Sequence, residues 1–98
     1  MPAVARKGDI VNTGHGCDST TTIAEHSPDV FADGINVARK GDSLTVHTVP
    51  DGASCVPHTS KINVGSGTVF VNGIPLARVG DSADSGSIAK GSGTVFAG

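Results

Sequence analysis

The sequence predicts a single all-β domain built from short antiparallel strands and tight turns, arranged as copies of one unit. Three observations lead to this prediction. Two sequence blocks each occur three times, Asx-Gly pairs separate short β-branched runs, and no segment has the periodicity of an amphipathic helix. Because 98 residues is the size of one domain, we assign residues 1–98 to a single unit.

The shorter repeated block is Ala-Arg-x-Gly-Asp. It occurs at Ala5–Asp9, Ala38–Asp42 and Ala77–Asp81. The Gly-Asp pair that ends each copy is read as turn chemistry alone, since Gly adopts positive φ and Asp bonds to nearby backbone. Three copies of the motif predict an internal pseudo-threefold arrangement.

The longer repeated block runs from an Ile to a Phe. Its copies are Ile62–Phe70, Ile88–Phe96 and, more loosely, Ile23–Phe31. The first and second copies in chain order continue into an Ala-Arg motif, whereas the last stops at Gly98. We therefore expect the cycle to close on the N-terminal Ala-Arg motif, with the two termini close together.

The strand positions follow from the turns. The runs Thr68–Val71 and Leu76–Val79 flank Asn72-Gly73, and an Asn-Gly pair between β-branched runs is a strong hairpin signal because type I′ turns need positive φ. Asp33-Gly34 occupies the same place in the preceding copy. Between residues 43 and 61, by contrast, two prolines and a glycine indicate a long irregular loop.

Composition indicates that the core needs support. The chain has 14 Gly, 3% aromatic residues and no Trp or Tyr, so the core must be built from Val, Ile, Ala and three Phe. Conformational entropy nearly cancels apolar burial in so small a chain, and such scaffolds usually depend on a metal, disulfides or a partner.

Charge and hydropathy exclude several classes of function. The net charge is −2 and the pI is about 6.0, which provides no basic surface for nucleic acid. No run of about 18 apolar residues could span a bilayer. Residues 1–9 lack an apolar segment of the kind found in Sec signals, so any export is expected to be independent of Sec.

The chain is rich in metal-ligating residues for its size, and a tetrahedral zinc site needs only four of them. The candidates are His15, Cys17, His26, His47, Cys55 and His58. With no secretory signal, both cysteines are expected to be reduced.

The spacing of these candidates favours some of them as ligands but does not determine the complete set. Cys55 and His58 form a C-x2-H pair that can hold one ion, and His15 and His47 follow the first two Gly-Asp turns at nearly equivalent places. His26 aligns with Gly65 and Gly91, which favours an exposed turn residue. The side chain of Cys17, two residues after His15, points elsewhere in an extended chain.

These motifs together resemble the PAAR-repeat proteins. The resemblance rests on the repeated Ala-Arg-x-Gly-Asp, on the stretch Gly65–Arg78 and on Thr13–Gly16, and it extends over nearly the whole chain. The Pro-Ala-Ala-Arg sequence that names the family reads Pro75-Leu76-Ala77-Arg78 and Asn36-Val37-Ala38-Arg39 here. We interpret these differences as conservative packing changes.

The resemblance implies a cone whose broad base sits on the blunt end of a trimeric β-helical spike and whose apex is stapled by zinc. Family members hold the ion with His and Cys, which here selects His15, His47, Cys55 and His58 and leaves Cys17 and His26 outside. Beyond the spike, only a transient contact with a target membrane is expected, with neither nucleic acid nor a small-molecule substrate. A phage tail tip is favoured because no effector extension is present; the tip of a type VI secretion spike is the alternative.

Docking on the spike is expected to use a flat apolar base and exposed backbone edges, in the manner of β-augmentation. The base is expected to be formed by Val30, Phe31, Val69, Phe70, Val95 and Phe96 or their neighbours.

Other classes of function fit less well. A metallohydrolase would hold zinc with His15, His47 and His58 and use Asp18 or Asp51 as base, but Cys55 would fill the open position. A nucleophile pair of Cys55 with His47 or His58 lacks an oxyanion-hole motif. A zinc-binding adaptor fits no C2H2 spacing. We therefore expect a protein that is not an enzyme.

Overall fold

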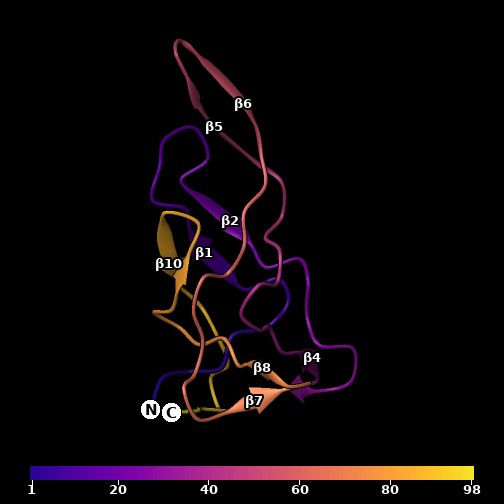
Figure 1. Ribbon diagram of the computed structural model, residues 1–98. Coiled ribbons are helices and arrows are strands. Elements are labelled where there is room, and N and C mark those ends of the chain that lie inside the picture. The colour runs from indigo at the N-terminus through magenta and orange to yellow at the C-terminus, as the bar shows by residue number, and fades with distance from the viewer.

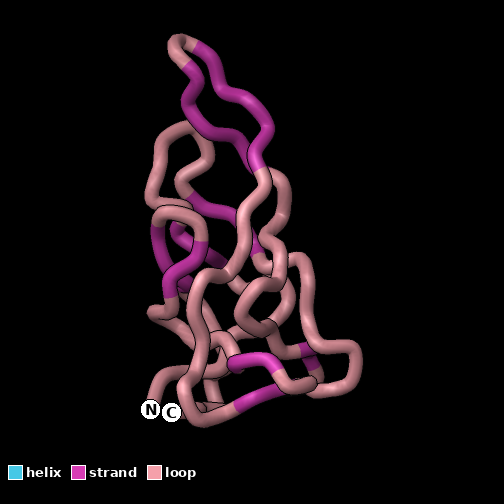
Figure 2. The backbone as a smooth tube through the Cα atoms, viewed as in Figure 1, coloured by secondary structure: helices cyan, strands magenta, loops and turns pink.

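The computed structural model describes residues 1–98 and confirms the all-β class, with no helix anywhere in the chain. The molecule is an elongated cone of 42 × 23 × 21 Å, broad where the two termini lie and narrowing to a single hairpin (Figure 1). Short strands alternate with longer loops throughout (Figure 2). No helix is present that could cross a membrane. The strands are β1 (Ile10–Asn12), β2 (Thr20–Thr22), β3 (Phe31–Ala32), β4 (Ile35–Asn36), β5 (His47–Asp51), β6 (Ser54–His58), β7 (Phe70–Val71), β8 (Ile74–Pro75), β9 (Ser82–Ala83) and β10 (Gly86–Ile88).

All strand pairs are antiparallel. The largest sheet has the order β2-β1-β10-β9 and joins the two ends of the chain, because Val11 pairs with Ile88. The remaining strands form three two-stranded hairpins, β3-β4, β5-β6 and β7-β8. We call β5-β6 the apical hairpin, since it forms the narrow end of the cone (Figure 1).

A ring of backbone hydrogen bonds lies at the centre of the pseudo-threefold. Ala5 N donates to Ala77 O (3.0 Å), Ala38 N to Ala5 O (2.9 Å), and Ala77 N to Ala38 O (3.0 Å). All three alanines are fully buried, which explains why the repeated motif begins with the smallest side chain that has a Cβ. The predicted pseudo-threefold is therefore present in the backbone itself.

The core is assembled from triads, one residue from each repeat. The central core comprises Ala5, Ala38 and Ala77, then Ile23, Ile62 and Ile88, then Val11, Leu44 and Ala83. The basal core, nearer the broad end, comprises Val4, Val37 and Leu76, then Ala32, Val71 and Ala97. Aliphatic side chains fill both clusters, as predicted for Val, Ile and Ala, but the prediction that the three phenylalanines belong to the core is wrong, because all three are exposed.

Each Ala-Arg-x-Gly-Asp motif forms a turn closed by its own ion pair. Arg39 donates to the Asp42 carboxylate from its backbone N (2.8 Å), from Nε (3.0 Å) and from Nη2 (3.0 Å). The same fork joins Arg6 to Asp9 and Arg78 to Asp81. The aspartates thus do more than turn chemistry: they fix the arginines in a bidentate geometry.

Each repeat forms a hairpin at the broad end of the cone, and two of these basal hairpins, β3-β4 and β7-β8, have the predicted Asx-Gly turns. Asp33 and Asn72 both have φ of 56°, followed by glycines at 75° and 76°. In the third, the two chain ends replace the turn: Ala3 bridges Phe96, and Ala97 N donates to Pro2 O (3.0 Å). The termini are adjacent, as the repeat pattern predicted.

The apical hairpin differs from the expected irregular loop. Pro50 pairs with Cys55, and Thr48 pairs with Pro57, within two five-residue strands. A hairpin of only two strands has two outer edges, where a proline loses no ladder hydrogen bond. The prolines are therefore compatible with a strand here, although they would interrupt a central one.

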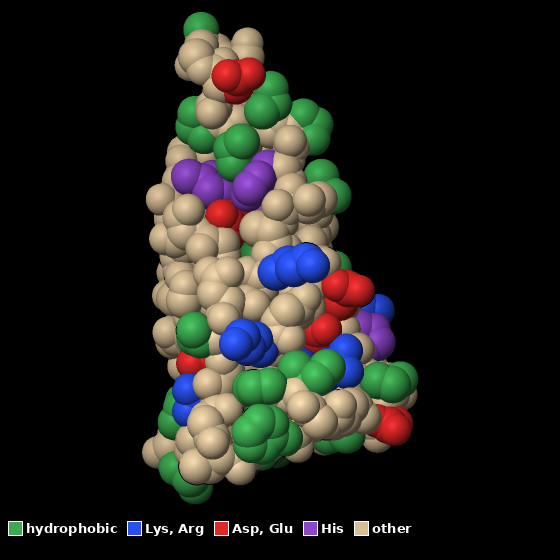
Figure 3. Space-filling view, viewed as in Figure 1, with side chains coloured by type: hydrophobic (Ala, Val, Ile, Leu, Met, Phe, Trp, Pro, Cys, Tyr) green, Lys and Arg blue, Asp and Glu red, His purple; other side chains and the backbone are tan.

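The broad end exposes large apolar side chains. Phe31, Phe70 and Phe96, one from each repeat, are 55%, 57% and 49% exposed. Hydrophobic side chains also gather at the broad end in the space-filling view (Figure 3). Of the other residues predicted for this surface, Val30 and Val95 are exposed, whereas Val69 packs against the basal core.

Candidate metal centre

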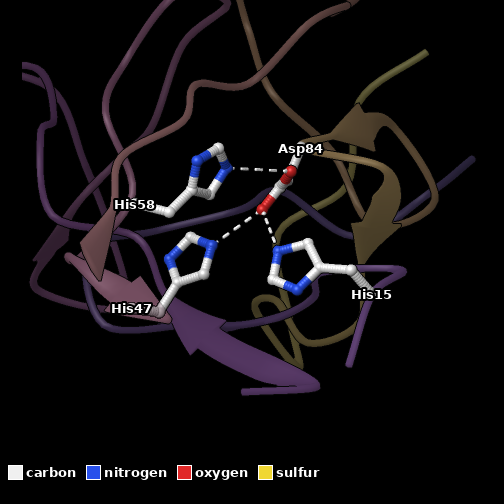
Figure 4. A group of neighbouring side chains, drawn as sticks. All are labelled: His15, His47, His58 and Asp84. Carbon is white, nitrogen blue, oxygen red and sulfur yellow. Dashed lines mark hydrogen bonds and ion pairs between the residues drawn. The ribbon is translucent and has the colours of Figure 1, made fainter. Parts of the chain in front are cut away.

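The three repeats diverge at the narrow end, and each contributes to one cluster of side chains. The first repeat supplies His15 from the loop 13–19, the second supplies His47 and His58 from the apical hairpin, and the third supplies Asp84 from the turn between β9 and β10. The three imidazoles point toward the carboxylate (Figure 4). Histidine side chains are visible together just below the narrow end in Figure 3.

The ligand atoms of this cluster converge closely. His15 Nε2 lies 2.9 Å and His47 Nε2 2.7 Å from Asp84 Oδ2, and His58 Nε2 lies 3.4 Å from Asp84 Oδ1. One ligand atom from each of the four residues lies within 4.8 Å of the others. The rings of His15 and His47 are stacked with their centroids 5.2 Å apart, and His58 meets both edge-on.

The apical hairpin places two of the histidines. His47 and His58 are a directly opposed cross-strand pair, so their side chains project from the same face of the hairpin. His47 is 4% exposed. Its Nδ1 lies 2.8 Å from the carbonyl of Thr45, and His15 Nδ1 lies 2.9 Å from the carbonyl of Gly16.

These carbonyl contacts determine which nitrogen faces the cluster. A carbonyl only accepts, so Nδ1 of both rings carries the proton and donates it. Nε2 is then directed toward Asp84, where it can offer its lone pair to a cation. Such a contact from the second ring nitrogen to a carbonyl is the usual support of a metal-binding histidine.

Asp84 is held by its backbone and by its neighbours. Its φ of 54° is the left-handed conformation of a tight turn, its N donates to Lys61 O (3.1 Å), and Asn63 Nδ2 donates to its carbonyl oxygen (3.0 Å). The hydroxyl of Ser60, the one buried side-chain polar atom without a hydrogen-bond partner, lies beside the carboxylate and lowers its pKa.

Two glycines allow the loops to meet. A Cβ on Gly14 would overlap the backbone carbonyl of Ser85, and a Cβ on Gly86 would overlap the carbonyl of Asn12. Gly14 also has φ of 78°, a conformation that favours glycine. This close approach brings the loop that carries His15 against the turn that carries Asp84.

The electrostatics favour an ionised carboxylate. Burial by itself would raise the pKa of the Asp84 carboxyl, but the polar groups of His47, His15, Ser60 and His58 around it outweigh burial and lower the pKa to about 2. The pKa of His15 is raised, first by its bond to the Gly16 carbonyl and further by Asp84, against the opposing effect of burial. The cluster therefore combines one fixed negative charge with three imidazoles.

Three imidazole nitrogens and one carboxylate oxygen form a donor set suited to zinc. Tetrahedral zinc with bonds near 2.1 Å separates its ligand atoms by about 3.4 Å. The distance of 3.4 Å from His58 Nε2 to Asp84 Oδ1 matches that value, whereas those of 2.7 and 2.9 Å from His47 and His15 to Oδ2 are hydrogen-bond lengths that would have to increase by about 0.5 to 0.7 Å around an ion. Four protein ligands are typical of a structural zinc site, whereas a catalytic site keeps one position for water.

The structure brings together three of the four predicted ligands, His15, His47 and His58. Cys55 is not among them: it forms a disulfide with Cys17, so the expectation of reduced cysteines is wrong. The reason lies in the strand, because side chains alternate between faces and Cys55 therefore points away from the face of β6 that presents His58.

Sequence reasoning missed Asp84. A usable signal existed, since the third Gly-Asp turn is followed by Asp84 much as the first two are followed by His15 and His47. Asp84 was outside the set of candidate ligands because that set contained only Cys and His residues.

The remaining candidates lie outside the cluster. His26 Nδ1 contacts the carbonyl of Ser27; the residue is half-buried and lies in neither a strand nor a turn, which differs from the exposed turn residue that the alignment favoured. Asp18 accepts from Thr48 N (2.8 Å) and Oγ1 (2.9 Å), which joins the loop 13–19 to the apical hairpin. Asp51 is exposed at the end of β5.

Comparison with known families gives one match. The PAAR motif family matches residues 13–89 and, in a second overlapping alignment, residues 58–98. Two overlapping matches are consistent with the internal repeats. No curated protein matches the chain.

Proposed function

The chain belongs to the PAAR motif family, and from this premise we propose that it caps a trimeric β-helical spike as a metal-stapled, membrane-piercing tip. PAAR motif proteins sit at the tips of spikes in phage tails or type VI secretion systems. The role is mechanical: the cone narrows the blunt end of the spike and must resist deformation under axial load. It requires no chemical reaction.

The observation that carries this proposal is the polarity of the cone. Its narrow end holds the four-residue cluster of candidate ligands, and its broad end exposes three phenylalanines related by the pseudo-threefold. A broad end with threefold repetition matches the symmetry of a trimeric spike. The narrow end has no apolar core of its own, because no residue between Leu44 and Ile62 belongs to either core cluster.

We propose that His15, His47, His58 and Asp84 hold one zinc ion, with Asp84 in the place first assigned to Cys55. The donor set of imidazole and carboxylate suits zinc. Because the site does not exist in the unfolded chain, its binding free energy adds to folding, by about 10 kcal/mol or more for structural zinc. The ion would crosslink all three repeats at the end where apolar packing is absent.

We propose that the broad end docks on the spike through Phe31, Phe70 and Phe96. Large exposed apolar side chains in a group are typical of interaction surfaces. The short basal strands β3 and β7 each have a strand partner on one side only, so their outer backbone edges can pair with spike strands. The membrane contact of the narrow end is transient in this scheme.

The docking test mixes the protein with a trimeric β-helical spike and measures the mass of the complex by light scattering. We expect one chain per spike trimer. Replacing all three phenylalanines by serine should abolish the complex, whereas Val46→Ser, an exposed change near the narrow end, should preserve it. Binding that is unaffected by the triple change would contradict the docking surface.

The biological setting is tested separately. As the tip of a phage tail, our first proposal, the protein co-purifies with intact virions at about one copy per tail. As a type VI tip, it appears outside the cell only when the secretion apparatus is functional.

A further inference from the structure

The disulfide joins two segments that each carry a candidate metal ligand. Cys17 lies in the loop 13–19, two residues after His15, and Cys55 lies in β6, three residues before His58. The two cysteines are 38 residues apart in sequence, and their Cα atoms are 6.0 Å apart. The crosslink therefore closes the first repeat's loop onto the second repeat's hairpin.

Little else holds these two segments together. The loop and the hairpin are connected by three hydrogen bonds between Asp18 and Thr48, two of them exposed side-chain contacts. No residue of either segment belongs to a core cluster. Without the disulfide, the loop and the hairpin would be joined directly only by these hydrogen bonds, by the ring contacts of His15 with His47 and His58, and by the ion.

The disulfide is open to chemical change. Both cysteines are exposed to solvent, so a small thiol can reach either sulfur. Cys17 has φ of 63°, a left-handed conformation that is unfavourable for most residues with a side chain. Exposed or strained disulfides are typically the reducible ones.

Reduction does not supply a replacement ligand in this geometry. Cys55 projects from the opposite face of β6 to His58, and the fourth position of the cluster is filled by Asp84. The effect of reduction is thus the loss of a crosslink, with the four ligands unchanged.

We propose that the Cys17–Cys55 disulfide is a reversible redox clamp that sets the metal affinity of the site formed by His15, His47, His58 and Asp84. This inference rests on the proposed metal site. In the oxidised form the loop and the hairpin are preorganised, so binding the ion orders less of the chain. In the reduced form the cost of ordering the loop and the hairpin is subtracted from the free energy of metal binding.

The chemistry is ordinary thiol–disulfide exchange. Two molecules of a low-molecular-weight thiol reduce the crosslink: the Cys17–Cys55 S–S bond breaks, both sulfurs gain a proton, and the thiols form their own disulfide. The reverse reaction closes the clamp with a disulfide of the same class as oxidant. The state of the site thereby follows the redox poise around it, open in a reducing cytoplasm and closed in an oxidising space.

The test is a zinc competition titration of the wild-type protein in three states: oxidised, reduced with a phosphine, and reduced then reoxidised. We expect reduction to weaken zinc binding by about 10- to 100-fold, the range seen when support around metal ligands is lost, and reoxidation to restore it. Hydrogen exchange of the β5 and β6 amides should become faster in parallel.

The double variant Cys17→Ser, Cys55→Ser is the matched control. It should bind zinc with the affinity of the reduced protein, and the phosphine should not change it. Equal affinities in the oxidised and reduced wild-type protein would overturn the clamp while leaving the metal site intact. Tighter binding after reduction would overturn it too, and would show that a thiolate is a ligand. No zinc in any state would remove the metal site together with the clamp.

Discussion

At the scale of single residues, the repeated arginines show how a short motif determines more than a turn. Each guanidinium binds the aspartate of its own motif, and two of the three also reach across to the next corner of the base. Arg6 Nη1 donates to Asp33 (3.1 Å), and Arg39 Nη1 donates to Asn72 (3.2 Å). These side chains link neighbouring repeats laterally at the edge of the basal core.

The first residue-scale prediction concerns Asp84, the proposed fourth ligand of the zinc ion. Asp84→Asn keeps the shape of the side chain but removes the charge that binds the cation. Zinc affinity should fall by about 100-fold or more, at the upper end of what even an outer-shell change costs. Competition titration against a chromophoric chelator measures it.

The control for this variant is Asp51→Asn, at the exposed end of β5. It should bind zinc like the wild type. If Asp84→Asn also did so, the ion would have a different fourth ligand.

The corner carboxylate Asp33 gives a prediction for pH dependence. Hydrogen bonds from Ser92 and Thr94 lower the pKa of Asp33 against the opposing effect of burial, and Arg6 lowers it further. A folded-state pKa below the unfolded value contributes stability above the ordinary pKa of about 3.9, and this contribution is lost as the pH falls through the folded value.

Asp33→Asn should therefore lower the urea midpoint at pH 6 but bring the two proteins together at acid pH, where wild-type Asp33 is protonated. The residue at the equivalent corner is Asn72, so the fold accepts the amide. Any loss of metal at acid pH affects both proteins and cancels in their difference. A constant gap between them at every pH would contradict this account of Asp33.

At the scale of elements, the sequence predicted those hairpins whose turns depend on the conformational preferences of their own residues. The Asp33-Gly34 and Asn72-Gly73 hairpins were predictable because positive φ is required at both turn positions and few residues accept it. The apical hairpin was not, because its prolines are acceptable only where both strands are edges, and that is a property of the assembled fold.

The element-scale prediction concerns the close contact between the loop that carries His15 and the turn that carries Asp84. In Gly86→Ala the new Cβ would overlap the carbonyl of Asn12, and since both groups are backbone, neither can rotate away. We expect a loss of about 3 kcal/mol or more in unfolding free energy, together with weaker zinc binding as Asp84 is displaced.

Gly93→Ala is the matched control, because no atom lies within 4 Å of the place its Cβ would take. Its free energy of unfolding should stay within about 0.5 kcal/mol of the wild type. Denaturant unfolding of the three proteins measures both effects. Equal stability of Gly86→Ala and Gly93→Ala would show that the loops do not meet as described.

At the scale of the whole molecule, the fold was predictable because the sequence repeats three times. The site was less predictable because it is formed where the three repeats differ in sequence. The thrice-repeated motif indicated both the pseudo-threefold and the closure of the chain on itself, and the ring of Ala5, Ala38 and Ala77 is its centre. The cluster lies where the repeats differ most. Three histidines could be selected by their spacing and their places in the repeats, whereas the disulfide and Asp84 depend on how three unlike loops meet at the apex.

The most direct test of the central claim is the metal content of the purified protein, measured with its thermal melting before and after chelation. The account predicts about one zinc per chain and, once the ion is removed, a melting temperature lower by about 20 °C or more, since each kcal/mol of lost stability corresponds to about 4 to 8 °C in a domain of this size. His47→Ala should reproduce the chelated state, and His26→Ala should behave as the wild type. Protein that contains no metal and melts at the same temperature with or without chelator would contradict the stapled tip.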